Sequence, residues 1–196
     1  MTDALVISNL LLWLVVLALL VAVIALARQL GILYERVAPM GALTLDAGPA
    51  VGSPAPQMSL RALDGKAIEL GAPTRTATLL FFLSPTCPVC KKLLPVLRSV
   101  QGAERDWLTV VLASDGELAE HQAFVARHGL VDFPYVLSRD LGLAFRVGKL
   151  PYAVLVDERG QVRAKGLVNS REQIESLFNA RDLGVASVQE FVRQRA

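Results

Sequence analysis

The sequence predicts an α/β domain with a partly parallel sheet, preceded by one N-terminal transmembrane helix. Three observations lead to this prediction. A long apolar run opens the chain, strand patterns alternate with helical patterns after residue 51, and both cysteines stand between a predicted strand and a predicted helix. Alternating strands and helices are typical of a sheet that is covered by helices. We expect an anchor over residues 4–27, a linker over 28–50 and one globular domain over 51–196.

The first element is the apolar run. No residue from Ala4 to Ala27 is charged, and the stretch from Leu10 onward is continuously apolar. A helix of about 18 such residues is roughly 27 Å long, close to the thickness of the hydrocarbon core of a bilayer. A cleaved signal peptide is the alternative, because Ala25-Leu26-Ala27 has the form of a cleavage site. However, no Lys or Arg precedes the run, which is also longer than a usual signal core, so we expect an uncleaved anchor in the lipid bilayer.

Strand and helix patterns then alternate along the domain. Five short apolar segments have the pattern of strands: 76–84, 107–114, 133–138, 152–156 and 161–166. Helical patterns follow the cysteines to about Ala103, cover 116–129 and 140–148, and run from a capping box at Ser170 to about Ala180. Pro95 falls inside the first of these helices, where a proline is expected to kink the axis. The segment 28–50 is rich in Ala, Gly and Pro and is expected to continue the anchor helix to about Val37 before becoming a linker.

The two cysteines of the chain, Cys87 and Cys90, have Cys-x-x-Cys spacing at the start of a predicted helix. A thiol in the first turn lies near unpaired backbone N–H groups and the positive end of the helix dipole, and both favour the thiolate. Lys91 and Lys92 add positive charge. Cys87, nearer to the strand, is the candidate for the exposed nucleophile, and Cys90 for the more buried resolving thiol. The pattern predicts a redox-active disulfide.

Several other interpretations of the cysteine pair remain open. A structural disulfide would close so short a loop that little chain entropy is removed. A zinc site would need two more ligands, and the spacing of His121 and His128 does not fit one, so both are expected to be solvated helix residues. Thiolates suit copper(I), so a copper-delivery module is an alternative, as are a peroxidase and a non-enzymatic docking protein. We expect no metal and no cofactor besides the disulfide, and the scattered net charge of +2 does not point to nucleic acid.

These residues together resemble the thioredoxin fold. The resemblance rests on the buried strand, the Cys-Pro-Val-Cys helix start, Pro95 five residues later and the stretch "KLPYAVLVDERGQV". The lead-in from Val51 and the extra strand and helix between Asp115 and Phe145 are similar to the TlpA- and peroxiredoxin-like variant of this fold. That variant occurs in membrane-tethered proteins of bacterial disulfide and cytochrome maturation. The chain as a whole resembles the methylamine-utilisation D (MauD) family, accessory proteins for making methylamine dehydrogenase.

The resemblance implies properties of the site that the local sequence does not give. Pro151 would be a cis-proline facing the cysteine pair, Leu150 would pair with the backbone of a bound client, and Thr86 would contact the client. The client would be a protein with cysteines, the dehydrogenase small subunit, and a membrane redox partner would recycle the pair. Phe81 stands where thioredoxins carry a buried Asp, so proton transfer must use water or another group.

Charge and resemblance disagree on the compartment of the domain. Arg28 and Arg36 follow the apolar run and no Lys or Arg precedes it, which by the positive-inside rule places the domain in the cytoplasm. The family resemblance implies the periplasm, where disulfide chemistry on secreted proteins takes place. We expect a single-pass protein of the inner membrane with a periplasmic catalytic domain. The direction of electron flow stays open among oxidation, reduction and isomerisation.

Overall fold

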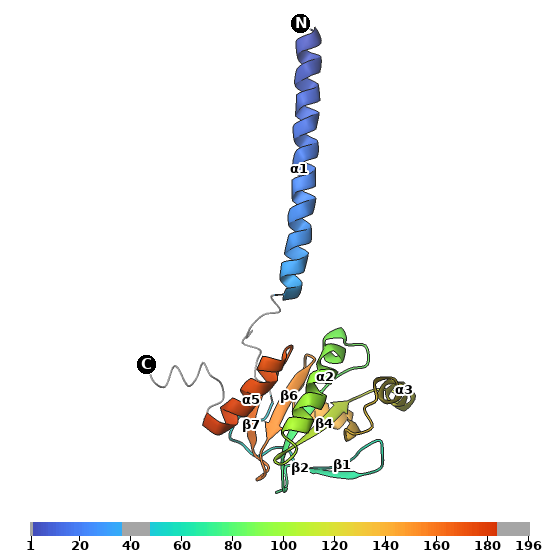
Figure 1. Cartoon of the computed structure of the whole chain (residues 1–196), viewed down its shortest axis with the longest axis vertical. Coiled ribbons are helices and arrows are strands. Elements are labelled where there is room, and N and C mark those ends of the chain that lie inside the picture. The colour runs from blue at the N-terminus through green and yellow to red at the C-terminus, as the bar shows by residue number, and fades with distance from the viewer. Residues whose placement is uncertain (1, 37–47, 184–196) are drawn as a thin grey trace. The chain divides into compact units, whose positions relative to one another are not determined.

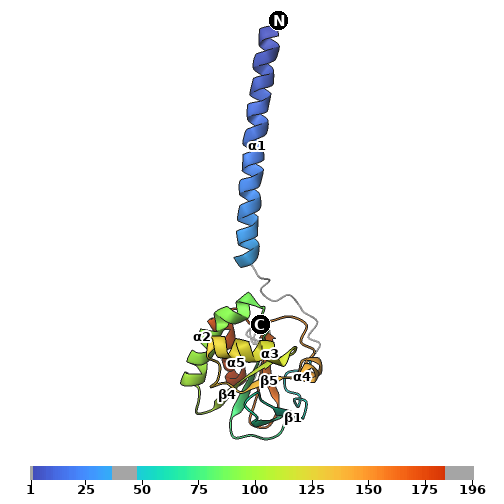
Figure 2. The same cartoon turned by 90° about the vertical axis from the view of Figure 1, so that its right-hand side faces the viewer.

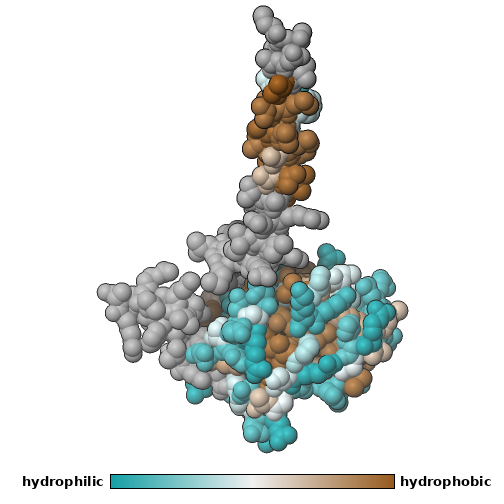
Figure 3. Space-filling view, turned by 45° about the horizontal axis from the view of Figure 1, so that its top comes forward, coloured by the Kyte–Doolittle hydropathy of each residue, from teal (hydrophilic) through white to brown (hydrophobic). Residues whose placement is uncertain are grey.

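A computed structural model describes residues 2–36 and 48–183, and the chain forms two compact units, residues 1–45 and 46–196. The first unit contains one helix, α1 (Thr2–Arg36). The side chains from Ile7 to Ile24 are all exposed, and this stretch is long and apolar enough to cross a membrane. Figure 3 shows apolar side chains over this part of the helix. The helix therefore fits a single-pass membrane anchor.

The second unit is built on a five-stranded mixed sheet (Figure 1). The strands lie in the order β5-β4-β3-β6-β7, where β3 pairs in parallel with β4, β4 in parallel with β5, and β6 antiparallel with β3 and β7. Their bounds are β3 (Ala77–Phe82), β4 (Leu108–Ser114), β5 (Tyr135–Leu137), β6 (Tyr152–Val156) and β7 (Val162–Leu167). All five correspond to segments predicted as strands, and the topology is the predicted thioredoxin-like fold.

The central strand β3 explains why its sequence is apolar without alternation. Leu79 and Phe81 face one hydrophobic core, while Leu80 and Phe82 face a second core on the opposite side of the sheet. A strand covered on both faces has no solvent-exposed positions to fill with polar residues. Phe81, which replaces the acid of thioredoxins, is fully buried in the first of these cores.

Helices cover both faces of the sheet. Their bounds are α2 (Pro88–Ala103), α3 (Leu118–His128), α4 (Arg139–Ala144) and α5 (Arg171–Leu183). Side chains of α2, α3 and α5 belong to the core that contains Phe81, and those of α4 belong to the other core. Figure 2 shows this division, with α4 lying apart from α2, α3 and α5. As predicted, α2 continues through Pro95, whose ring is exposed on the solvent face; the kink itself stays a prediction.

The lead-in to the domain contains a hairpin that the strand patterns did not predict. The strands β1 (Met58–Arg61) and β2 (Ala67–Leu70) pair antiparallel and form a separate two-stranded sheet. Gly65 in their turn has a φ of 85°, a conformation that glycine adopts without steric cost. Met58, Leu60 and Ile68 pack against the core on the α4 side of the main sheet.

Candidate active site

The cysteine pair lies where the central strand passes into α2. β3 ends at Phe82, a short loop follows, and Cys87 is the N-cap residue of α2 with an extended backbone conformation. Its Sγ accepts a hydrogen bond from the backbone N–H of Cys90 at 3.1 Å. Pro88 follows at the first helical position, where its missing N–H leaves no hydrogen bond unmade. The Cys-Pro order therefore places a sulfur directly over the N-terminus of the helix.

Cys87 and Cys90 are joined by a disulfide, with their Cα atoms 5.3 Å apart. Cys90 is completely buried, whereas Cys87 is only partly buried, so another protein can reach the first sulfur and not the second. After reduction, the helix N-terminus would stabilise a thiolate at Cys87. No acidic residue lies in the first turn of α2 to oppose that charge, and Lys91 and Lys92 are exposed on the next positions. The geometry suits a nucleophile at Cys87 and a resolving thiol at Cys90.

The other predicted site residues come from the start of β6. Because Phe82 pairs with Tyr152, residues 150 and 151 lie at the same edge of the sheet as the loop that carries Cys87. The Leu150–Pro151 peptide bond is cis, as the resemblance to thioredoxins implied. Pro151 is buried and its carbonyl accepts a hydrogen bond from the N–H of Val168 at 3.2 Å.

Leu150 differs from its neighbour in being open to solvent. Its side chain is 41% exposed. Among the described residues, none forms a hydrogen bond with the backbone N–H or carbonyl of Leu150. Thr86 is also exposed, and its hydroxyl lies 2.9 Å from that of Ser84. Leu150 therefore presents free backbone groups beside an accessible sulfur.

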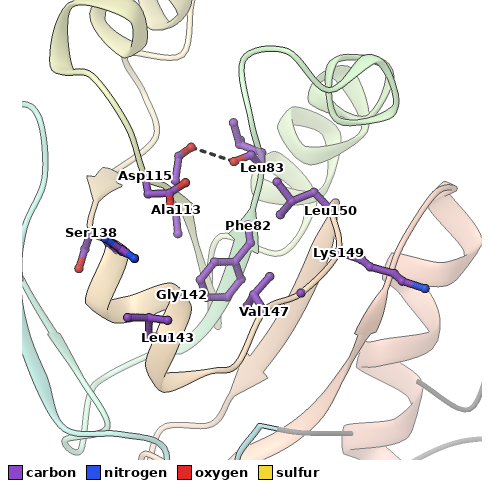
Figure 4. A pocket seen from close by; sticks show the side chains of 13 residues that line it. Phe82, Leu83, Ala113, Asp115, Ser138, Gly142, Leu143, Val147, Lys149 and Leu150 are labelled. Carbon is purple, nitrogen blue, oxygen red and sulfur yellow. Dashed lines mark hydrogen bonds between the residues drawn. The ribbon is translucent and has the colours of Figure 1, made fainter. Parts of the chain in front are cut away.

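A pocket of about 240 Å³ opens at this edge, between α4 and the loop before β6 (Figure 4). Its apolar side chains include Phe82, Leu143, Val147 and Leu150, and the figure shows the Phe82 ring at its centre. No pattern in the sequence predicts this pocket, because its walls combine the ends of β3 and β4 with residues 138–150, and these three segments are distant along the chain.

Behind this pocket lies a buried polar network that the sequence interpretation missed. His121, expected to be solvated, is only 1% exposed, so that expectation was wrong. Its Nε2 lies 2.9 Å from the carbonyl oxygen of Asp115, which can only accept, so Nε2 carries the proton. In the neutral ring, Nδ1 then accepts from the Tyr135 hydroxyl at 2.8 Å. Close by, the Ser114 hydroxyl donates to the Leu83 carbonyl at 2.8 Å, the dashed line in Figure 4.

The helical spacing of α3 could have identified His121 as buried. His121, Phe124, Val125 and His128 recur at intervals of three and four residues, which places them on one face of a helix. Phe124 belongs to the core and Val125 packs against it. A polar residue on that face needs a partner, and Tyr135, itself 2% exposed, supplies one. Burial raises the pKa of the Tyr135 hydroxyl to about 12.

Among residues 2–36 and 48–183, no three His, Cys, Asp or Glu side chains lie together in a way that could hold a metal ion. Both nitrogens of His121 are occupied by hydrogen bonds within the fold. The chemistry that the described side chains bring together is that of the disulfide.

Comparison with known proteins agrees with this fold. Residues 50–180 match the Redoxin family. The chain is 48% identical over 190 residues to "Methylamine utilization protein MauD" of Methylorubrum extorquens, covering 96% of this chain and 92% of that protein. It is 32% identical over 119 residues to "Thiol-disulfide oxidoreductase ResA" of Bacillus subtilis, covering 57% of this chain and 64% of ResA. The crystal structure of a putative thiol:disulfide interchange protein DsbE from Chlorobium tepidum superposes with a TM-score of 0.62 at 19% identity, covering 68% and 99% of the two chains.

Proposed function

Because the chain belongs to the MauD family of redoxins and is a thiol–disulfide oxidoreductase, we propose that Cys87 and Cys90 exchange a disulfide with a protein client during methylamine dehydrogenase maturation. The observation that carries the proposal is the Cys87–Cys90 disulfide at the N-terminus of α2, with the Leu150–Pro151 bond on the same sheet edge. A partly exposed sulfur over a helix N-terminus and a buried one beside it are what sequential exchange needs.

The exchange has two steps when the reduced pair acts on a client disulfide. The Cys87 thiolate attacks one client sulfur, so that a mixed disulfide forms and the second client sulfur leaves as a thiolate that is protonated from water. Cys90 then loses its proton and attacks the Cys87 sulfur, which re-forms the Cys87–Cys90 disulfide and releases the reduced client. Oxidation of a client is the same sequence in reverse. With Phe81 in place of an acid, water is the proton carrier for Cys90 in either direction.

Three residues around Cys87 hold the client in this proposal. The unpaired backbone of Leu150 takes one or two hydrogen bonds from an extended client segment, as an added strand does at a sheet edge. Pro151 fixes the position of that backbone, and Thr86 contacts the client from the opposite side of Cys87. This arrangement brings a client cysteine to the exposed sulfur and keeps it away from Cys90.

The client and its compartment complete the proposal. The helix over residues 4–27 anchors the chain in the inner membrane, and the catalytic domain faces the periplasm, where secreted proteins acquire disulfides. The client is the small subunit of methylamine dehydrogenase. A second membrane protein restores the redox state of the pair after each exchange.

Trapping tests the exchange and its client together. In cells that produce the dehydrogenase, Cys90→Ser should accumulate a mixed disulfide between Cys87 and the small subunit that a reductant dissolves. Cys87→Ser should form none, and the variant lacking both cysteines is the control for non-covalent association. Acid quenching, alkylation and non-reducing gels with mass spectrometry identify the adduct. If both single variants kept wild-type exchange, the mechanism would be wrong; a different trapped protein would overturn only the client assignment.

A further inference from the structure

The two segments that meet at the exchange site carry basic residues and no acidic ones. Residues 70–103, which include the cysteine pair, contain four basic residues and neither Asp nor Glu. Residues 141–156, which include the Leu150–Pro151 bond, contain Arg146 and Lys149 and again no acid. The whole chain has a net charge of only +2, so this is a local excess of positive charge.

The cations next to the cysteines point outward and are not neutralised. Lys91 and Lys92 are exposed, while Cys90, Leu93 and Leu94 face the core, so the two lysines lie on the solvent side of the first turns of α2. Neither lysine forms an ion pair within the described part of the chain. Their charge is therefore free to act on a molecule that approaches Cys87.

The segment before β6 also carries exposed basic residues. Arg146 and Lys149 are exposed, and no ion pair joins either to a carboxylate among residues 48–183 that the structure describes. Figure 4 shows that Lys149 extends away from the pocket while Leu150 lies at the pocket itself. An acid, Asp115, belongs to the far wall of the pocket, at the end of β4. Both segments that meet at this end of the sheet thus carry exposed basic side chains, whereas the wall of the pocket at the end of β4 carries an acid.

We propose that this basic rim, formed by Lys91, Lys92, Arg146 and Lys149, selects client segments in which acidic residues flank the reacting cysteine. The inference rests on the proposed exchange function and adds the class of client sequence. Opposite charges on the two surfaces raise the rate of productive encounter and disfavour clients with basic flanks. The effect weakens with added salt, because the charges on both partners are exposed.

The test uses the full chain in a non-ionic detergent and three short peptides that differ only in their flanks. One has Asp and Glu beside a single cysteine, one has Asn and Gln, and one has Lys. Each cysteine is activated as a mixed disulfide with 2-thiopyridine. The reduced Cys87 attacks the peptide sulfur, a protein–peptide disulfide forms, and pyridine-2-thione leaves with one proton and is followed by absorbance. Rates with 2-mercaptoethanol correct for the intrinsic reactivity of each peptide.

We expect the acidic peptide to react about tenfold faster than the uncharged one at low salt, and the ratio to fall toward one in about 0.5 M salt. Lys91→Gln/Lys92→Gln and Arg146→Gln/Lys149→Gln should each lower the ratio about threefold. Using the ratio cancels any change in the reactivity of Cys87 itself. The control is Lys66→Gln/Arg105→Gln, which removes two charges at the β1–β2 turn and beyond the far end of α2, and should leave the ratio unchanged.

Two results would overturn the inference, and they differ in what else they overturn. Equal rates for all three peptides, or a ratio that neither double variant lowers, would refute charge selection and leave disulfide exchange standing. No reaction of the wild-type chain with any peptide would refute the exchange function and the inference together.

Discussion

Replacing Tyr135 by Phe removes one hydroxyl from the interior of the domain and tests whether the buried network stabilises the fold. Tyr135 is 2% exposed and His121 1% exposed, and the hydroxyl is the partner of the His121 Nδ1 at 2.8 Å. The Phe ring has the same shape, so the packing of β5 against the core is retained. What changes is that Nδ1 of His121 is left in a site that water does not reach.

The size of the loss follows from that unpaired nitrogen. A buried polar group without a partner costs about 1–3 kcal/mol. We therefore expect Tyr135→Phe to lower the free energy of unfolding by about 2 kcal/mol at neutral pH, which in a domain of this size lowers Tm by about 6 °C. The variant Tyr135→Phe/His121→Leu removes the unpaired Nδ1 as well and should recover part of the loss, because the Asp115 carbonyl that loses its Nε2–H donor belongs to an exposed residue.

The pH dependence of the same variant has a defined sign. Burial raises the pKa of Tyr135 to about 12, whereas an unfolded tyrosine has a pKa of about 10. The folded state therefore holds the Tyr135 proton more tightly than the unfolded state does. The stabilisation of the fold that results is fully present below about pH 10 and is lost as the pH rises through about 12. The stability difference of about 2 kcal/mol between wild type and Tyr135→Phe should shrink toward zero over that interval, because a pKa shift of about two units is worth about 2–3 kcal/mol.

Urea unfolding of the full chain in non-ionic detergent, followed by near-UV circular dichroism, measures both effects. Series at about pH 7, 10 and 11.5 give the free energy of unfolding of each variant. A Tyr135→Phe variant as stable as wild type at neutral pH would show that the network contributes nothing. A stability difference that stays constant from about pH 7 to about pH 11.5 would refute the raised pKa of Tyr135.

Three further predictions concern other parts of the structure. Gly160→Ala should lower the free energy of unfolding in urea by at least about 2 kcal/mol, because φ is 77° and a Cβ would meet the carbonyl oxygen of Gly71. The matched control is Gly52→Ala, where φ is 84° but the surroundings are open, and it should lower the free energy of unfolding by about 1 kcal/mol. Equal losses for the two variants would contradict the close approach of Gly160 to Gly71. Leu97→Ala in the fully buried face of α2 should lower the free energy of unfolding by about 2–5 kcal/mol, and a loss below 1 would contradict that burial. Leu14→Lys places a charge at the centre of the apolar helix and should shift the protein from the membrane to the soluble fraction on carbonate extraction; unchanged membrane retention would contradict a spanning helix.

The strand and the helix next to the cysteines could be predicted because their sequences are compatible with few other structures. The apolar run of β3 fits a central strand buried on both faces, and a Cys-x-x-Cys motif directly after it has to begin a helix on one of those faces. Cys87 and Cys90 were therefore found from the residues themselves. The cis bond before Pro151 was expected only from the resemblance, because X-Pro bonds are mostly trans and nothing local marks this one.

The hairpin of β1 and β2 was missed because its strands are short and half exposed. Each has four residues, and their burial alternates without a strong apolar pattern. The signal that could have found them is Asp64-Gly65, a dipeptide typical of a tight turn between strands.

The buried network was missed for a different reason, since it depends on contacts that the local sequence does not contain. His121 is satisfied by Tyr135, which lies 14 residues further along the chain and reaches it only when β5 is in place. An interpretation that considers His121 without its partners in the fold predicts a solvated side chain. The pocket has the same origin, because α4 and the loop before β6 meet the ends of β3 and β4 only in the folded domain.

The strand order of the main sheet also bears on how the protein is synthesised. The ribosome delivers Cys87 and Cys90 well before Pro151, which follows Cys87 by 64 positions. Until β6 is synthesised and pairs with β3, the thiols belong to an incomplete sheet that lacks Leu150 and Pro151. The two thiols of the nascent chain are therefore present before the segment that is proposed to hold the client. Pairing of β6 with β3 brings Leu150 and Pro151 to the end of the sheet that carries Cys87, and the proposed client site is complete only then.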